Sequence, residues 1–319
     1  MIPKSLPHDP EESLAIRAAW LHYVGGLTQT AVAKRLGVPS VKAHRLIARA
    51  VADGRVKVTI DGDMVECALL EHRLASRYGL DLCEVAPDLD EPGIPFRALA
   101  MAGAGFLRRE IERGHNPVIG LGHGRTLAAT VQQLPQIDAP GLKFVSLFGG
   151  LTRNYSANPQ DVMHRIAEKT GARSYVLPMP FFANSADDRE VLLAQRGVAE
   201  VFALASTARL KLTGIGTVEP DAQLVSSGMI ETNEINAIRA DGGVGELLGH
   251  FFDAQGRVLT TALTARTLGV PFAPDTDQIV AVAGGAVKVQ AIRAVLMSGR
   301  LQGLITDERT AKALLADGR

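Results

Sequence analysis

The chain has 319 residues, of which 46% are hydrophobic and 21% charged, and its formal net charge is zero. This composition excludes a disordered chain, and the length predicts one small and one large domain. No apolar run is long enough to span a membrane, and the first residues, MIPKSLPHDPEE, lack the hydrophobic stretch of an export signal. Cys67 and Cys83 are too few for a disulfide framework or a metal cluster, so we expect buried thiols in a cytoplasmic protein.

The chain begins with a predicted helix over residues 11–24. Its apolar side would carry Leu14, Ala18 and Leu21, and Trp20, the only tryptophan, is expected to anchor the core. This helix would complete a three-helix core with the two helices that follow.

Residues 28–50, TQTAVAKRLGVPSVKAHRLIARA, predict two short helices joined by a tight turn. The first would end at Leu36, before Gly37, which tolerates the positive φ of a helix end. Ser40 is expected to cap the second helix, with Pro39 just outside it. Ala43, Leu46, Ile47 and Ala50 then form a narrow apolar seam, and the remaining positions are polar or cationic. Such a helix fits the major groove of DNA.

Charge supports DNA binding by this segment. Residues 28–60 contain seven basic residues and one acidic residue, Asp53, so they carry +6 and the rest of the chain carries −6. Asp53-Gly54 and the strand-like residues 56–60 resemble the wing of a winged helix-turn-helix. The alternative is a helical hairpin with a solvated charged face. The candidate DNA contacts are Thr28, Gln29, Ser40, Lys42, His44, Arg45 and Arg49.

We place the domain boundary near Asp61, which gives a DNA-binding domain over 1–60 and a larger domain over 61–319. A helix over 65–78, with Leu69, Leu70 and Leu74 as its apolar residues, would serve as a connector or a dimer contact.

The larger domain alternates strands and helices. Strands are predicted at 80–87, 116–122, 142–150, 173–180, 209–216, 278–285 and 301–307, with helices at 124–134, 159–170, 189–197 and 287–299. Such alternation predicts an α/β fold with a Rossmann-like parallel sheet covered on both faces. Residues 244–259 differ and suggest a hairpin, with its tip at 253–256.

Glycines gather where four of these strands end. The clusters are Gly120, Gly122 and Gly124; Gly149 and Gly150; Gly214 and Gly216; and Gly284 and Gly285. Any one cluster could be an ordinary turn, but ligands bind at this edge of an open α/β sheet. Four clusters therefore predict a crevice.

The stretch from Gly120 to Thr126, GLGHGRT, is the most informative, because it follows a strand and opens a helix whose free amides would face an anion. Arg125 and Thr126 add a guanidinium and a hydroxyl suited to phosphate. The spacing matches neither the dinucleotide fingerprint nor the P-loop.

Three further residues are candidates for the same ligand. Lys288, in the first turn of a helix, would oppose the helix dipole unless an anion is bound, although it could be solvated. Glu246 could accept hydrogen bonds from sugar hydroxyls or be a surface carboxylate. His123 could contact the ligand or cap its loop. Because no catalytic triad, metal cluster or pair of catalytic carboxylates stands out, the pattern indicates recognition and not catalysis.

Together these motifs resemble the SorC family of bacterial transcriptional regulators, from about Ala18 to Leu315. The resemblance rests on WLHYVGGLTQTAVAKRLGV, VIGLGHGRTL, TGIGTV, LLGHFFDAQGRVL, VAVAGGAVKVQAI and LITDERTAKALL.

The resemblance implies a helix-turn-helix domain followed by a domain with the glucosamine-6-phosphate deaminase/ribose-5-phosphate isomerase-like fold. That domain would bind a phosphorylated sugar or polyol, without a cofactor and without catalysis. The bound effector would change the affinity of the protein for operator DNA. A homodimer or homotetramer is expected. By this resemblance the phosphate-binding loop corresponds to Gly122, Gly124, Arg125 and Thr126, and the effector-contacting acidic residue and lysine correspond to Glu246 and Lys288. The residue pattern adds His123, Gly149 and Gly150 to the candidate effector residues.

The sequence departs from the family pattern at several positions. Pro39-Ser40 replaces the common Ser-Arg, His123 a common tryptophan, Glu246 a common aspartate, and Ala286 and Val287 replace acidic residues. Two other functions remain open at this point. One is a sugar-phosphate isomerase or deaminase with an appended basic domain, and the other is a structural DNA-binding protein whose large domain only oligomerises.

Overall fold

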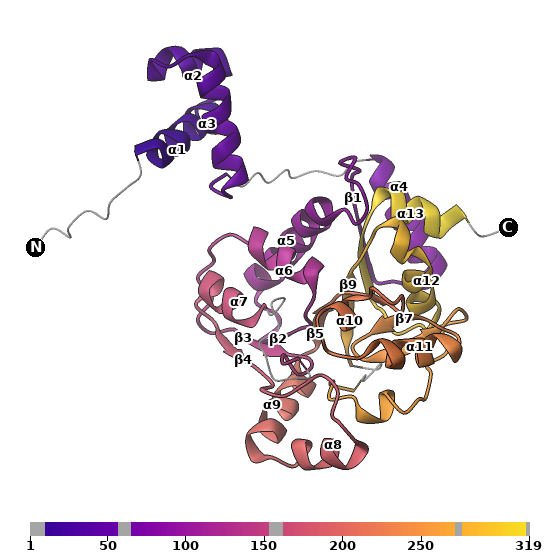
Figure 1. Cartoon of the computed structure of the whole chain (residues 1–319). Coiled ribbons are helices and arrows are strands. Elements are labelled where there is room, and N and C mark those ends of the chain that lie inside the picture. The colour runs from indigo at the N-terminus through magenta and orange to yellow at the C-terminus, as the bar shows by residue number, and fades with distance from the viewer. Residues whose placement is uncertain (1–9, 57–64, 153–161, 272–275, 317–319) are drawn as a thin grey trace, which may run out of the picture. The chain divides into compact units, whose positions relative to one another are not determined.

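The computed structural model describes residues 10–56, 65–152, 162–271 and 276–316. The chain divides into two compact units, Met1–Asp61 and Gly62–Arg319 (Figure 1). Each unit has its own hydrophobic core and is described by itself.

The N-terminal unit consists of α1 (Pro10–Tyr23), α2 (Gln29–Leu36) and α3 (Ser40–Ala52). The predicted seam of α3 is confirmed, because its four apolar residues are all buried against α1 and α2. The predicted strand of the wing lies outside the described residues apart from Val56.

The turn between α2 and α3 follows the prediction in one respect and not in another. Gly37 ends α2 with a φ of 65°, and its N–H points to the carbonyl groups of Ala33 and Lys34. Ser40, however, is the first residue of α3 and not its cap. Pro39 occupies the cap position with φ −58° and ψ 148°, so the fixed φ of proline determines the direction in which the chain enters α3. No side chain accepts a capping hydrogen bond at this end of the helix.

The prediction that Trp20 anchors the core is wrong. Ala15, Ala18 and Ala19 line the buried face of α1, and these small side chains let the neighbouring helices approach closely. The indole lies on the other side of α1 and is 58% exposed.

The larger unit is an alternating α/β structure (Figure 1). Its strands are β1 (Leu82–Ala86), β2 (Val118–Leu121), β3 (Lys143–Ser146), β4 (Arg173–Tyr175), β5 (Leu210–Thr213), β6 (Gly216–Thr217), β7 (Gly243–Leu247), β8 (His250–Asp253), β9 (Gln278–Val282) and β10 (Gly303–Asp307). Its helices are α4 (Val65–Tyr78), α5 (Phe96–Arg113), α6 (Arg125–Gln133), α7 (Met163–Thr170), α8 (Ala186–Leu193), α9 (Arg196–Thr207), α10 (Gln223–Ser226), α11 (Thr232–Ala240), α12 (Val289–Met297) and α13 (Glu308–Ala316), with short 3₁₀ turns at Thr264–Arg266 and Ala286–Lys288.

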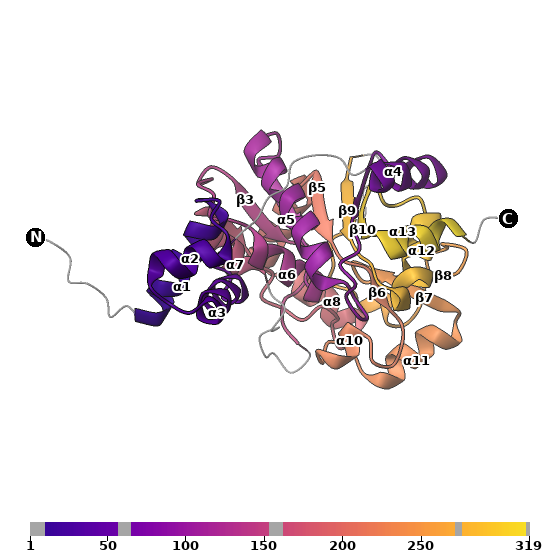
Figure 2. The same ribbon diagram turned by 90° about the horizontal axis from the view of Figure 1, so that it is seen from above.

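Seven strands form one parallel sheet in the order β1-β10-β9-β5-β2-β3-β4. Along β5, Leu210 and Leu212 join the core under α5, α6 and α7, whereas Lys211 points to the opposite face. That face is covered near β1 by α4, α12 and α13, which Figure 2 shows together on one side of β9 and β10. Near β2 and β3 it is covered by α9. The predicted fold class, a parallel sheet covered on both sides, is confirmed.

A second, antiparallel sheet has the order β6-β7-β8. The predicted hairpin exists, but its tip was misplaced. The turn between β7 and β8 is at Leu248 and Gly249, with φ values of 50° and 80°, as a type I′ turn requires. Residues 253–256 form a separate turn after β8, closed by the Gly256 N–H to the Asp253 carbonyl.

The predicted helix over 65–78 is present as α4, which packs on β1 and α13. Leu70 and Leu74 are buried, but Leu69 is 61% exposed and does not belong to the core. Cys67 is buried and Cys83 half-buried, and both are free thiols.

The strand order positions a ligand site. From β2 the chain adds β3 and β4 on one side, and it then returns to place β5 on the other side of β2, followed outward by β9 and β10. The order therefore reverses between β2 and β5, whose Leu121 and Leu212 are in register. Ligands of open α/β sheets bind at the carboxyl ends of strands at such a reversal.

Candidate functional site

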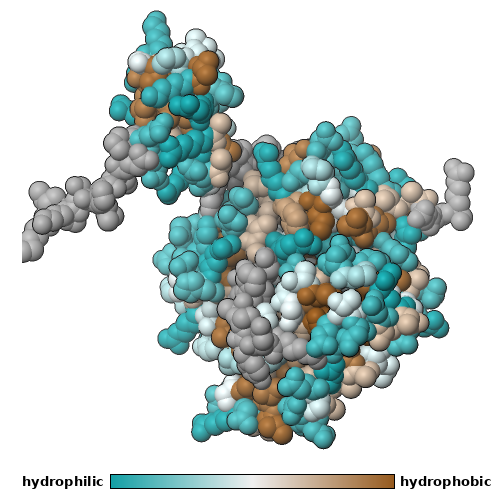
Figure 3. All heavy atoms as spheres, in the orientation of Figure 1, coloured by the Kyte–Doolittle hydropathy of each residue, from teal (hydrophilic) through white to brown (hydrophobic). Residues whose placement is uncertain are grey.

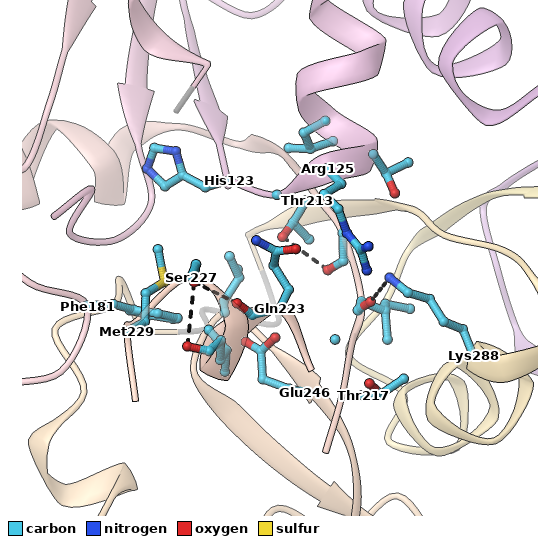
Figure 4. Close-up of a pocket in the computed structure, with 18 of the residues that line it drawn as sticks. His123, Arg125, Phe181, Thr213, Thr217, Gln223, Ser227, Met229, Glu246 and Lys288 are labelled. Atoms are coloured by element: carbon cyan, nitrogen blue, oxygen red, sulfur yellow. Dashed lines mark hydrogen bonds between the residues drawn. The ribbon is translucent and has the colours of Figure 1, made fainter. Parts of the chain in front are cut away.

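A cleft of about 760 Å³, including the part open to solvent, lies at this reversal point. Its walls come from the segments that follow β2 and β5, from the second sheet and from the start of α12 (Figure 4). The polar lining residues are His123, Arg125, Thr126, Thr213, Thr217, Gln223, Ser227, Glu246 and Lys288.

The start of α6 contributes backbone as well as side chains. Gly124 has a φ of 129°, which L side chains rarely adopt, and its carbonyl accepts the first helical hydrogen bond, from Ala128. Arg125 and Thr126 form the first turn of α6, whose N–H groups have no acceptor within the helix. This end of the helix therefore offers amide donors and a partial positive charge to the cleft.

Two cations converge on one end of the cleft. The Arg125 guanidinium points toward Lys288 and stacks 5.6 Å from the ring centre of Phe96 (Figure 4). Lys288 Nζ donates to the Ile215 carbonyl at 2.6 Å. Burial and the neighbouring Arg125 lower the pKa of Lys288 to about 8, against the opposing effect of Glu246.

Glu246 is the only carboxylate among the described residues that line the cleft. It is buried on β7, opposite Gly216 of β6, and its Oε1 accepts the Gly249 N–H at 2.6 Å. Burial raises the pKa of Glu246 to about 7, although the Gly249 N–H and Lys288 both favour the carboxylate. A Cβ at position 216 would lie 2.5 Å from Glu246 Oε2, so glycine leaves room for this carboxylate.

His123 lies at the other end of the cleft, against an aromatic wall. Its Nε2 is 3.1 Å from Ser146 Oγ, which donates its own proton to the Phe148 carbonyl at 2.5 Å. Nε2 therefore carries the hydrogen in this contact. The imidazole meets the Phe148 ring edge-to-face, and Phe148 stacks on Phe181 at 4.0 Å between ring centres.

Four polar residues of the cleft were not predicted from the sequence: Thr213, Thr217, Gln223 and Ser227. Gln223 and Ser227 come from the short helix α10 and its end, and the Gln223 carboxamide extends into the cleft (Figure 4). Thr213 and Thr217 flank Gly214 and Gly216, one of the glycine clusters that predicted the crevice, so the sequence did indicate their segment. Nothing in the local pattern marked α10, because a four-residue helix has no periodicity to read.

Three predicted effector residues do not line the cleft: Gly122, Gly149 and Gly150. At two of these positions packing requires a glycine. A Cβ on Gly122 would lie 2.7 Å from Thr213 Oγ1, and one on Gly149 would lie 2.2 Å from the Met179 carbonyl oxygen. Gly150 donates its N–H to the Leu177 carbonyl at 3.3 Å. The other six, His123, Gly124, Arg125, Thr126, Glu246 and Lys288, are brought together in the cleft.

The predicted DNA contacts gather on α2 and α3. Thr28 caps α2, with its hydroxyl accepting the Ala31 N–H at 3.2 Å. Gln29 Oε1 and His44 Nδ1 are 3.0 Å apart, so the starts of the two helices are joined by side chains. Ser40 and Arg45 are exposed, and Lys42 and Arg49 are partly buried.

Two acidic residues of α1 contact this cationic face. Glu11 lies 3.2 Å from Arg49 and 3.9 Å from Arg45, and Glu12 pairs with Arg55. Exposed ion pairs of this kind contribute little to stability, so they can be exchanged for phosphate contacts.

Within the described ranges, no group of three or more histidine, cysteine, aspartate or glutamate residues is arranged to hold a metal ion. Among those same residues, no helix combines the length and apolar character needed to cross a membrane.

Comparison with known proteins gives the family. Residues 63–316 match a family model described as "Putative sugar-binding domain". The chain is 67% identical to the erythritol catabolism regulatory protein EryD of Brucella abortus, over 96% of this chain and 98% of that one. It is 33% identical to the transcriptional regulator LsrR of Klebsiella pneumoniae, over 96% and 94% of the two chains.

Solved structures show the same fold. The full-length sorbitol operon regulator SorC from Klebsiella pneumoniae aligns with a TM-score of 0.68 and 24% identity, over 96% of this chain and 99% of that one. These relatives are transcriptional regulators and not isomerases or deaminases, so the regulator prediction is confirmed and the enzyme alternative is not supported. The chain belongs to the SorC family of transcriptional regulators with a sugar-binding domain.

Proposed function

We propose that the chain is a DNA-binding regulator of a carbohydrate or polyol catabolic operon and that a phosphorylated sugar or polyol controls it. Residues 1–60 bind operator DNA, and residues 61–319 bind the effector and hold a homodimer or homotetramer together. The regulation of erythritol catabolism by the Brucella relative favours a short polyol or its phosphate over a larger sugar.

One observation supports the phosphate most directly: Arg125 and Lys288 converge at the start of α6. The part of the chain that the structure describes gives the Arg125 guanidinium no carboxylate partner, and Lys288 uses a backbone carbonyl. Two cations and a helix N-terminus facing one small volume create a site for a dianion. Glu246 then supplies an acceptor for hydroxyl groups a few bonds away from the phosphate.

For DNA binding, the proposal uses Lys42, His44 and Arg45 as groove contacts, with Ser40 and Arg49 near the backbone. Thr28 and Gln29 at the start of α2 complete the set. The hydrogen bond between Gln29 and His44 fixes the start of α2 against α3. Arg49 exchanges Glu11 for phosphate oxygens on binding.

Thermal unfolding with a ligand series tests the effector assignment. We expect stabilisation by erythritol phosphate, a smaller effect of erythritol, and none from inorganic phosphate at the same concentration. A ligand at one hundred times its dissociation constant should stabilise the folded protein by about 2.7 kcal/mol. Arg125→Gln and Lys288→Gln should each remove the advantage of the phosphate, whereas Arg196→Gln, at an exposed position on α9, should not.

A gel-shift titration with DNA from upstream of the protein's own gene tests the output. The affinity should change when the stabilising ligand is added. Stabilisation by ligand with unchanged DNA affinity would contradict the regulatory part of the proposal, and stabilisation by no phosphorylated compound would contradict the effector part.

A further inference from the structure

Val41 is the most exposed large hydrophobic side chain in the part of the chain that the structure describes, at 81%. It is the second residue of α3 and takes no part in the hydrophobic core of the N-terminal unit. Valine is also a weaker helix former than alanine, lysine or arginine, so neither the core nor the helix explains its presence. Figure 3 shows hydrophobic residues among hydrophilic ones on the visible surface of this unit.

The direction of Val41 around the axis of α3 is defined by the buried residues of the same helix. Successive residues of an α-helix are turned by about 100°, so the buried seam of α3 is centred roughly 190° from Val41. Val41 therefore points directly away from the core. Ala48, which is also exposed, lies about 20° from the same line, two turns further along. We call Val41 and Ala48 the apolar ridge of α3.

Polar and cationic side chains lie on both flanks of the apolar ridge. Arg45 is turned about 40° from Val41 to one side and His44 about 60° to the other, and both are exposed. Because residues 28–60 carry a net charge of +6, the partner of this face is a polyanion. The apolar ridge must then meet an apolar group of that polyanion. In the major groove of DNA this group is the 5-methyl group of thymine.

A valine can reach a base only if the helix axis lies close to the base edges, because its side chain is short. Val41 is in the first turn of α3, and the residues that begin a recognition helix are those that contact base edges. Ala48 lies about 10.5 Å further along the axis and has no atom beyond Cβ that would hold the helix away from the bases. The apolar ridge thus combines a methyl-bearing side chain with the space for a close approach.

We propose that Val41 is a specificity-determining residue that contacts the 5-methyl group of a thymine in the operator, and that Ala48 permits the close approach. The inference rests on the DNA-binding part of the proposed function and adds a base preference to it. The contact selects thymine because none of the other three bases presents a methyl group in the major groove.

Replacement of thymine by deoxyuridine tests the contact, because it removes the methyl group and keeps every hydrogen-bonding group of the base pair. Duplexes that bind the full chain are selected in vitro from a random pool, and each thymine of the best duplex is then replaced in turn. In gel shifts, at least one replacement should weaken binding of the unsubstituted chain roughly fourfold, which corresponds to the burial of one methyl group. If no replacement weakens binding, the proposal is wrong.

The variant Val41→Ala identifies the side chain that contacts this methyl group. At the sensitive position its affinities for thymine and deoxyuridine should differ by less than about twofold, because removal of either partner of one contact leaves little for the second change to remove. Val51→Ala, at a 40% exposed valine in the last turn of the same helix, should keep the full difference. A full difference in Val41→Ala would assign the methyl contact to another residue and overturn the proposal.

The variant Ala48→Leu tests the close approach separately. It should weaken binding to the selected duplex by roughly tenfold or more and leave binding to unrelated DNA, which depends on phosphate contacts, unchanged. Ala199→Leu, at an exposed position on α9, should change neither, and both variants should unfold at the temperature of the unsubstituted chain. Unchanged affinity of Ala48→Leu for the selected duplex would contradict the close approach. If the unsubstituted chain enriches no duplex at all, DNA binding itself fails, and the proposed contact with it.

Discussion

The substitution Gly216→Ala offers a sharp test of the role of Glu246. The added Cβ would lie 2.5 Å from Glu246 Oε2 and 3.3 Å from its Cβ, so the carboxylate must move. Its other oxygen is held by the Gly249 N–H, and rotation would break that contact as well. A hydrogen bond from a ligand hydroxyl to a charged group is worth about 1.5–3 kcal/mol. Effector affinity should therefore fall by roughly 10- to 100-fold.

Gly214→Ala is the matched control, because Gly214 lines the same cleft two residues earlier. A Cβ there would meet nothing nearer than the Val282 carbonyl at 3.9 Å. Isothermal titration with the stabilising ligand should show near-normal affinity for Gly214→Ala, and urea unfolding should show that both variants remain folded. Normal affinity in Gly216→Ala, or an equal loss in both variants, would refute the reasoning that Glu246 contacts the effector.

Three further outcomes are expected. Asp277→Ala leaves the buried ammonium of Lys211 without its carboxylate and should lower the free energy of unfolding by about 3–5 kcal/mol. In urea titrations the double variant Lys211→Met/Asp277→Leu should recover most of this loss, because it buries no charge at the site. Because Lys288 loses its charge above a pKa of about 8, affinity for a phosphorylated ligand should fall roughly tenfold from pH 7 to pH 9 by calorimetry, and constant affinity would argue against this site. Arg49→Ala should reduce the salt dependence of operator binding by about 0.9 in the log–log slope, and an unchanged slope would remove Arg49 from the phosphate contacts.

Short-range patterns predicted the parts of the structure that short-range physics determines. The seam of α3 and the ending of α2 at Gly37 depend on residues within one or two turns, and both are confirmed. The position of the cleft at the carboxyl edge of the sheet was also predictable. Glycines at 124, 214 and 216 follow buried strands, and the carboxyl ends of parallel strands must meet at one edge.

The errors have tertiary causes. Trp20 was expected inside because of its size, but three alanines and Leu21 occupy the inner face of α1, and the indole lies outside. The turn of the β7–β8 hairpin contains Leu248 at positive φ, and leucine gives no turn signal. Gln223 reaches the cleft from a four-residue helix about a hundred residues away from Arg125, so only the folded chain brings the two together.

Two titratable groups of the cleft, Lys288 and Glu246, hold the same segment of chain. Lys288 donates to the Ile215 carbonyl, and Glu246 lies against Gly216, the next residue and its partner in the β6–β7 ladder. This segment connects β5, at the centre of the large sheet, to β6 of the small antiparallel sheet. Burial disfavours the charged forms of both groups, and an anion beside Lys288 with hydroxyls on Glu246 would replace the lost solvation. We therefore expect a bound ligand to act first on residues 214–217, at the junction of the two sheets.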